Sequence, residues 1–248
     1  PSANDMTIVA NDGESGNSLR GFTDQVNDIS KLSRYAPHGK VVRVEGSSET
    51  SDDAFYMAFN ADVASPVAGA HFGTAGTWLE TVAPGVPLGF DPATMPMLLT
   101  ENGVGFDLDV AEWADREAGD EDSNPEPSFV GKTINALGQF QERLVVLAGP
   151  SVVASRTNES NNFWSESATG QLDTDPLDFK STTVDVERLE SLTPHDRDLV
   201  IFAPEAQFII FGRNKLTPDN ASLVLTTRFE SNLAATPVPS GKVVFYCF

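Results

Sequence analysis

The chain has 248 residues, 40% of them hydrophobic, which suffices for a folded core in one large β domain or two smaller ones. Its 36 acidic residues outnumber 16 basic ones, and the formal net charge of −20 disfavours binding to nucleic-acid phosphates or to anionic membranes. A single cysteine, Cys247, excludes an intrachain disulfide framework and is typical of a protein made in a reducing compartment, and no apolar run has the length of a membrane helix.

The first part of the chain predicts one helix among short strands. Met6–Ala10 is a strand candidate within a polar stretch. Leu19, Phe22, Val26, Ile29 and Leu32 then recur every three or four residues. This spacing predicts an amphipathic helix over Leu19–Ser33, with Ser18 as its cap and Pro37 as its stop.

Strand patterns follow the predicted helix. The expected strands are Val41–Val44, Ala54–Phe59, Gly76–Val82, Met97–Thr100 and Val104–Leu108, the last two as a hairpin about Asn102-Gly103. Pro84–Pro92 is too rich in proline for a ladder. We therefore expect residues 1–127 to form a small α+β domain that ends in the acidic linker Asp115–Pro127.

After Pro127 the periodicity becomes that of strands alone. The expected strands are Thr133–Phe140, Arg143–Ala148, Val152–Ser155, Asp198–Phe202, Gln207–Phe211, Ser222–Thr227 and Val243–Tyr246. Two of the hairpins have similar shapes, one turning at Gly149-Pro150 and the other at Pro204-Glu205. Asp185–Leu192 is a candidate short helix between such units. Residues 128–248 are thus expected to be all-β, with antiparallel hairpins that suit either propeller blades or a sandwich.

The two ends of the chain suggest a piece of a longer protein. The chain starts at Pro1 and stops within the apolar run Lys242–Phe248, which has the pattern of a strand. We expect this last strand to lie at an open edge or to pair with another chain.

The densest carboxylate cluster in the sequence is a candidate metal site and contains Asp115, Glu117, Asp120, Glu121 and Asp122. The spacing of Asp120, Asp122 and Asn124 matches the start of an EF-hand loop. Pro125 and Gly131, however, stand where the loop needs glycine and a bidentate glutamate. A solvated acidic loop is the preferred interpretation, and the shorter segment Asp12–Gly16 is interpreted as a turn.

Asp173, Asp175 and Asp178 are the best candidates for a pair of glycosidase carboxylates, but Asp-x-Asp-Pro is also turn chemistry. The three histidines, His38, His71 and His195, are too far apart in sequence for a metal motif. No nucleophile elbow or phosphate loop is present, so we expect no catalytic, cofactor-binding or metal-binding residues.

Asn161-Asn162-Phe163-Trp164 places two large aromatic residues after two asparagines. The preferred interpretation is a tight turn that directs both aromatic rings into a core. The alternative is a platform on which a sugar or a base stacks.

A series of short sequence motifs between Trp113 and Asp178 resembles the nozzle proteins of short-tailed T7-like bacteriophages, a family also called tail tubular protein B. The residues that carry this resemblance are Trp113, Asp115, Arg116, Ala118, Gly119, Asp120, Asn124, Pro125, Pro127, Ser128, Phe129, Gly131, Arg143, Leu144, Ser155, Arg156, Phe163, Trp164, Asp173, Asp175, Pro176 and Asp178. Because many short motifs match in the same order, the resemblance is more specific than any one of them.

The resemblance implies a structural subunit of the virion tail, made in the host cytoplasm, and no enzyme. It further implies a propeller region and a six-fold ring of identical copies, in contact with a tail adaptor protein and tail fibres. Genome DNA would pass through the lumen during ejection without specific binding. The alternatives are a tail-associated enzyme that degrades polysaccharides and a carbohydrate- or receptor-binding β module.

Overall fold

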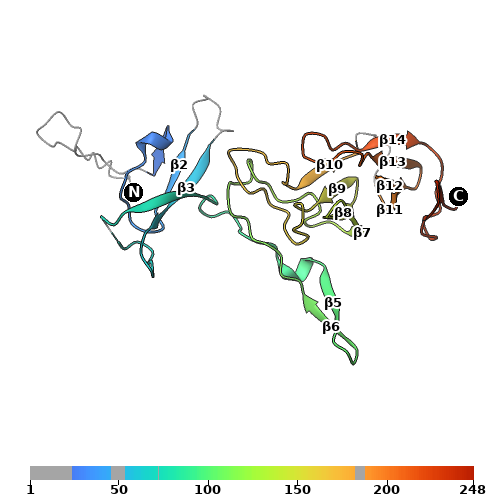
Figure 1. Cartoon of the computed structure of the whole chain (residues 1–248), viewed down its shortest axis with the longest axis horizontal. Helices are drawn as coiled ribbons and strands as arrows, with labels where there is room; N and C mark the ends of the chain where they lie inside the picture. The colour runs from blue at the N-terminus through green and yellow to red at the C-terminus, as the bar shows by residue number, and fades with distance from the viewer. Residues whose placement is uncertain (1–23, 46–53, 72, 182–187) are drawn as a thin grey trace, which may run out of the picture. The chain divides into compact units, whose positions relative to one another are not determined.

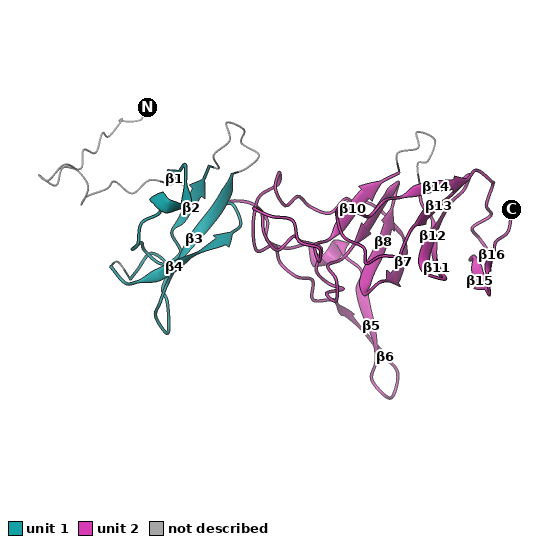
Figure 2. Ribbon diagram, turned by 45° about the horizontal axis from the view of Figure 1, so that its top comes forward, with its two compact units in different colours: residues 1–84 teal, residues 85–248 magenta. Residues whose placement is uncertain are grey.

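Strands make up most of the regular structure in the computed structural model, which describes residues 24–45, 54–71, 73–181 and 188–248 (Figure 1). The chain divides into unit 1, residues 1–84, and unit 2, residues 85–248 (Figure 2). No helix in the described ranges is long and apolar enough to cross a membrane.

Unit 1 is built on one four-stranded sheet. Its strands, in spatial order, are β1 (Gln25–Val26), β2 (Val41–Val44), β3 (Phe55–Ala61) and β4 (Gly76–Thr81). β1 runs parallel to β2, and the other neighbours are antiparallel. Every second side chain of β3 is buried, as expected of a strand with one face on a core. In this core Phe59 packs edge-on against Trp78, whose indole N–H donates to the Ser33 carbonyl at 2.8 Å.

The helix predicted over Leu19–Ser33 is wrong in the residues that the structure describes. Residues 25–26 form β1, and Ile29–Lys31 is only one 3-10 turn, η1, capped by the Asp28 carboxylate. The carbonyls of Asp24 and Val26 accept hydrogen bonds from the N–H groups of Arg43, in β2, and Glu45, just after it. Pairing with this strand therefore overrides the helical spacing of the apolar residues. Residues 19–23 and the strand candidate Met6–Ala10 lie outside the described ranges.

Unit 2 begins with a loop that contains η3 (Pro92–Thr94) and continues into the predicted hairpin, which is confirmed. Its strands are β5 (Met97–Glu101) and β6 (Phe106–Val110). The Asn102 carboxamide oxygen accepts hydrogen bonds from the N–H groups of Val104 and Gly105 and closes the turn. All ten strand residues of this hairpin are exposed.

Two four-stranded antiparallel sheets follow, and each is a meander in which neighbours in sequence are neighbours in space. The first contains β7 (Ile134–Phe140), β8 (Arg143–Ala148), β9 (Ser151–Ala154) and β10 (Leu177–Lys180). The second contains β11 (Ser191–His195), β12 (Asp198–Ala203), β13 (Ala206–Ile210) and β14 (Val224–Thr227). The two predicted hairpins, β8–β9 and β12–β13, are both confirmed. A two-stranded ribbon, β15 (Val238–Ser240) with β16 (Val243–Phe245), lies near the end of the chain.

The sheet β7–β10 is buried on both faces. On one face Val145, Leu147 and Val152 share a core with Leu199, Ile201 and other residues of the second sheet. On the other face Val146, Ala148 and Val153 pack against Met95, Phe129 and Phe163 from the loops. This double burial explains why β8 reads as a continuous apolar run instead of an alternating one.

Two further expectations differ from the structure. The short helix expected at Asp185–Leu192 is wrong at its described C-terminal end, because Ser191 and Leu192 start β11. β11 is an edge strand, a position that tolerates Pro194. The boundary expected after Pro127 lies inside unit 2, because Phe90, Met95 and Trp113 join the core that also contains Phe129. The small α+β domain is therefore not found in the described residues, whose fold is mainly β.

Candidate functional site

The residues that carry the family resemblance lie mainly in the loops that cover one face of β7–β10, the face that does not pack on the second sheet. We call residues 111–133 and 155–176 the loop layer. Phe129 and Phe163 from this layer are buried against Val146 and Val153 of the sheet. The loop layer is therefore part of the core of unit 2. Because most of the resembling residues lie in it, it is the candidate site.

Trp164 lies at the centre of a buried stack in the loop layer. Phe90 lies nearly parallel to its ring at 4.8 Å between centroids, and the Arg116 guanidinium carbon lies 4.3 Å from the ring centroid. The indole N–H donates to the Ala114 carbonyl at 2.9 Å. Asn162 holds the turn by accepting a hydrogen bond from the Trp164 N–H. The tight turn predicted at Asn161–Trp164 is confirmed, and Trp164 is too buried to serve as an exposed stacking platform.

Asn124 joins the two halves of the loop layer. Its amide N–H groups donate to the carbonyls of Ala118 and Ser165 at 2.9 and 3.0 Å. Its carboxamide oxygen accepts a hydrogen bond from the Ser165 N–H at 3.0 Å. Because Asn124 is buried, these bonds satisfy groups that water cannot reach. The residue thus has a structural role.

Arg143 is the most highly coordinated buried cation among the described residues. Its guanidinium donates to four backbone carbonyls, those of Ser155, Asp175, Asp173 and Leu216, at 2.6, 2.7, 3.1 and 3.2 Å. Burial lowers the pKa of Arg143 below its ordinary value, while the Asp175 carboxylate acts in the opposite direction. The side chain therefore ties the start of β8 to three distant segments of unit 2.

The three candidate glycosidase carboxylates have different partners. Asp175 is buried and accepts hydrogen bonds from the N–H groups of Glu166 and Leu172. Asp178, on β10, accepts one from the Ser128 N–H at 2.6 Å. Asp173 is exposed and contributes its backbone carbonyl to Arg143. Turn chemistry accounts for Asp175, and the carboxylates of Asp175 and Asp178 bind different backbone segments.

The acidic residues 115–122 also act locally. The Asp120 carboxylate accepts hydrogen bonds from the N–H groups of Asp122 and Ser123, and Glu121 pairs with the buried Arg116 at 3.0 Å. No group of three His, Cys, Asp or Glu side chains suited to a metal is found in the ranges that the structure describes. The nitrogen Nδ1 of His38 accepts a hydrogen bond from the Ala61 N–H, and Nε2 of His71 accepts one from the Val67 N–H.

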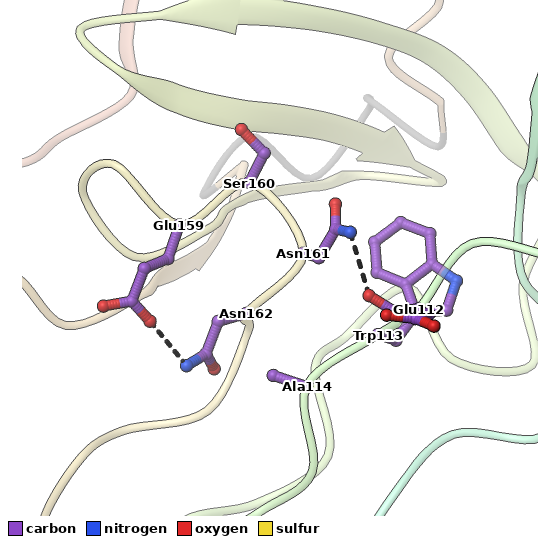
Figure 3. A pocket seen from close by; sticks show the side chains of 7 residues that line it. All are labelled: Glu112, Trp113, Ala114, Glu159, Ser160, Asn161 and Asn162. Carbon is purple, nitrogen blue, oxygen red and sulfur yellow. Dashed lines mark hydrogen bonds between the residues drawn. The ribbon is translucent and has the colours of Figure 1, made fainter. Parts of the chain in front are cut away.

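An open pocket of 590 Å³ lies at the edge of the loop layer (Figure 3). It is lined by Glu112, Trp113, Ala114, Glu159, Ser160, Asn161 and Asn162. Figure 3 shows the Asn161 amide directed at the Glu112 carbonyl, at 2.8 Å, and the Asn162 amide directed at the Glu159 carboxylate, also at 2.8 Å. Glu159 also pairs with Arg156. The polar groups of the wall thus connect two loops.

Sequence reasoning missed one feature with clear functional potential, the exposed apolar surface of the hairpin β5–β6. Leu99, Phe106 and Leu108 are each more than half exposed. The alternation of apolar and acidic residues in β6 could have signalled a strand with two unlike faces.

Comparisons with known proteins agree with the family resemblance that the residues of the loop layer carry. A family model described as bacteriophage nozzle protein matches residues 1–248. The tail tubular protein gp12 of Escherichia phage T7 is 31% identical to this chain over 241 residues, which are 97% of this chain and 29% of the T7 protein. The chain therefore spans less than a third of the length of this relative.

Proposed function

Because this chain belongs to the bacteriophage nozzle protein family, we propose that it is part of a structural subunit whose copies form a ring around the DNA channel of a phage tail. The family and the T7 relative are structural tail proteins and not enzymes. The observation that carries the proposal is the family match along all 248 residues.

The contacts of the resembling residues support a structural role. Arg143, Asn124 and Asp175 are buried and bind backbone groups of distant loops. Such side chains stabilise a loop layer, whereas catalytic side chains need access to a substrate. The chemistry of the site thus favours a rigid scaffold.

The acidic composition suits a channel that conducts DNA. With a net charge of −20, the chain has few cations with which to neutralise phosphates, so a genome would slide past it without strong binding. We propose that the ring is six-fold and that it contacts a tail adaptor protein and tail fibres.

The two meanders support a propeller as the finer architecture. Each is a four-stranded antiparallel sheet, and the two share one apolar core. Propeller blades have four strands and pack on their neighbours in this way. We propose that the two sheets are consecutive blades in the intact protein.

Cryo-electron microscopy of tails isolated from virions tests the proposed function. The expected result is a ring of six copies below the adaptor, with each copy surrounding part of the channel. Tails that lack the protein, or copies that lie outside a closed ring, would contradict the proposal.

A further inference from the structure

One end of the two meanders carries most of the left-handed backbone among the residues that the structure describes. Four of the five non-glycine residues with positive φ lie there. Gln141 and Glu142 form the β7–β8 turn, and Asn158 donates its N–H to the Glu142 carbonyl at 2.9 Å. Asp196 lies in the turn between β11 and β12. Such backbone is costly for a residue with a Cβ atom, and it gathers at clamps and switches. This end of unit 2 is therefore a candidate conformational device.

The β7–β8 turn is strained because of its sequence. β7 ends at Phe140 and β8 begins at Arg143, so the loop has two residues, Gln141 with φ 47° and Glu142 with φ 62°. Positive φ at both positions is the geometry of a type I′ turn, which favours Asn and Gly. The Glu142 side chain is exposed and has no hydrogen bond or ion pair to any described residue, so it does not offset the strain.

The Gln141 side chain binds a segment of the second meander. Its amide donates to the carbonyls of Gly212 and Asn214 at 2.8 and 3.1 Å. Its carboxamide oxygen accepts a hydrogen bond from the Leu216 N–H at 2.8 Å. We call residues 212–220, which lie between β13 and β14, the strap. Three bonds from one side chain thus join the strained turn of the first sheet to the strap of the second.

Two further side chains anchor the strap. Arg143 donates to the Leu216 carbonyl at 3.2 Å, and the Asp198 carboxylate accepts a hydrogen bond from the Gly212 N–H at 2.9 Å. Leu216 is buried, whereas residues 213–215 are exposed. Segments with few buried apolar contacts open locally at a lower free energy than the whole domain. The strap therefore meets the conditions for local opening.

Bonds within the strap hold it together as one piece. The Asn220 amide donates to the Lys215 carbonyl at 2.9 Å, and the Asn220 carboxamide oxygen accepts a hydrogen bond from the Thr217 N–H at 3.0 Å. Both bonds join strap residues to each other. An opening that breaks the bonds to Gln141, Arg143 and Asp198 thus frees the strap without unravelling it.

We propose that the strap opens as a unit and that Gln141 couples this opening to the strain of the β7–β8 turn. In the closed state the three Gln141 bonds hold the turn at positive φ. In the open state the turn is free to relax, and Leu216 leaves the apolar core that the two meanders share. A strained turn in one sheet thereby sets how firmly the strap of the other sheet is closed. The device is a property of unit 2 and does not depend on the proposed ring.

Hydrogen exchange of the intact protein, resolved to single amides by mass spectrometry with electron-transfer fragmentation, tests the opening. Gln141→Ala should speed exchange at the Leu216 N–H at least tenfold. It should also speed exchange at the Gly212 N–H at least fivefold, although this group binds Asp198 and not Gln141. Exchange in β8 and β12 should stay within twofold. Faster exchange at Leu216 alone, or faster exchange throughout β8 and β12, would show that the strap does not open as a unit and would overturn the proposal.

Glu142→Gly tests the strain separately. Glycine adopts positive φ without a steric cost and leaves every bond of the strap in place, so it stabilises the closed state. Exchange at the N–H groups of Leu216 and Gly212 should therefore become at least threefold slower. In the Gln141→Ala background the same change should alter these rates less than twofold, because the coupling has been removed. Equal or faster exchange in Glu142→Gly, or equal slowing in both backgrounds, would contradict the coupling between the turn and the strap.

Discussion

At the scale of single residues, the loop layer is held by polar side chains that bind backbone. Arg143, Asn124 and Asp175 each satisfy carbonyl or N–H groups of segments that are far apart in sequence. A buried polar group that loses its partner costs more than the bond itself contributes. Substitution at these positions should therefore reduce stability without removing any chemical activity.

Arg143→Met gives the first prediction. Methionine fills part of the volume but leaves four backbone carbonyls, three of them in buried bonds, without their donor, so the free energy of unfolding should fall by about 3 kcal/mol. Urea denaturation monitored by tryptophan fluorescence measures the change. Lys132→Met is the matched control at an exposed position, where a change within about 0.5 kcal/mol is expected. Equal effects of the two substitutions would contradict the role of the Arg143 bonds.

The second prediction concerns the three aspartates at 173, 175 and 178. The intact protein should release no reducing ends from host capsule or cell-wall glycans. The variant with all three residues changed to asparagine should differ from wild type only in stability, by about 1 kcal/mol for each lost backbone bond at Asp175 and Asp178. Glycan cleavage by the wild type that is absent from a folded triple variant would support the glycosidase alternative instead.

At the scale of elements, two strand ends in unit 2 approach each other so closely that the backbone leaves no space for a side chain at one position. Gly212 follows β13, and its N–H donates to the Asp198 carboxylate at the start of β12. A Cβ atom at this position would lie 2.0 Å from the Arg197 carbonyl oxygen. Only glycine therefore fits between these two strand ends without a shift of the backbone.

Gly212→Ala gives the third prediction. Because the clash is with backbone, the strand ends must move, and the expected loss of stability is about 3 kcal/mol. Gly105→Ala is the matched control, since a Cβ atom there meets nothing within 4 Å, and its effect should stay within about 0.5 kcal/mol. Thermal denaturation followed by circular dichroism measures both variants. A Gly212→Ala variant as stable as wild type would show that the approach is looser than described.

At the scale of the whole molecule, each of the two units has its own apolar core. Ala36, Phe59 and Ala61 form the centre of one core in unit 1. The larger cores of unit 2 lie on the two faces of β7–β10. Separate cores allow separate unfolding, because each unit loses its own buried contacts when it opens.

The fourth prediction uses one glycine in each unit. A Cβ atom at Gly76 would lie 2.2 Å from the Asn60 carbonyl oxygen, so Gly76→Ala should destabilise unit 1. Hydrogen exchange measured by mass spectrometry should become at least tenfold faster in β2–β4 and stay unchanged in β8 and β12. Gly212→Ala should give the reverse pattern. Faster exchange in both units from either single substitution would mean that the units unfold together.

The sequence by itself determined most of the strands of unit 2 and their two central hairpins, but it missed β10, β11 and β15. Alternation, apolar runs and the turn residues Gly149-Pro150 are local signals, and a strand needs little else to be recognised. The burial of Phe163 and Trp164 was also predicted, because large aromatic residues after a tight turn favour a core. The family could also be recognised from the sequence, because that recognition needs only the order of short matching segments and no knowledge of contacts.

The tertiary structure alone decided the rest. Residues 25–26 joined a sheet instead of a helix because β2, some fifteen residues away, offered a ladder. The four carbonyls around Arg143 come from segments 12 to 73 residues away, a distance that no local pattern encodes. The same holds for the unit boundary and for the exposed face of β5–β6: whether an apolar side chain is buried depends on which distant segments pack over it, and the free energy of that packing is not a property of any short stretch of sequence.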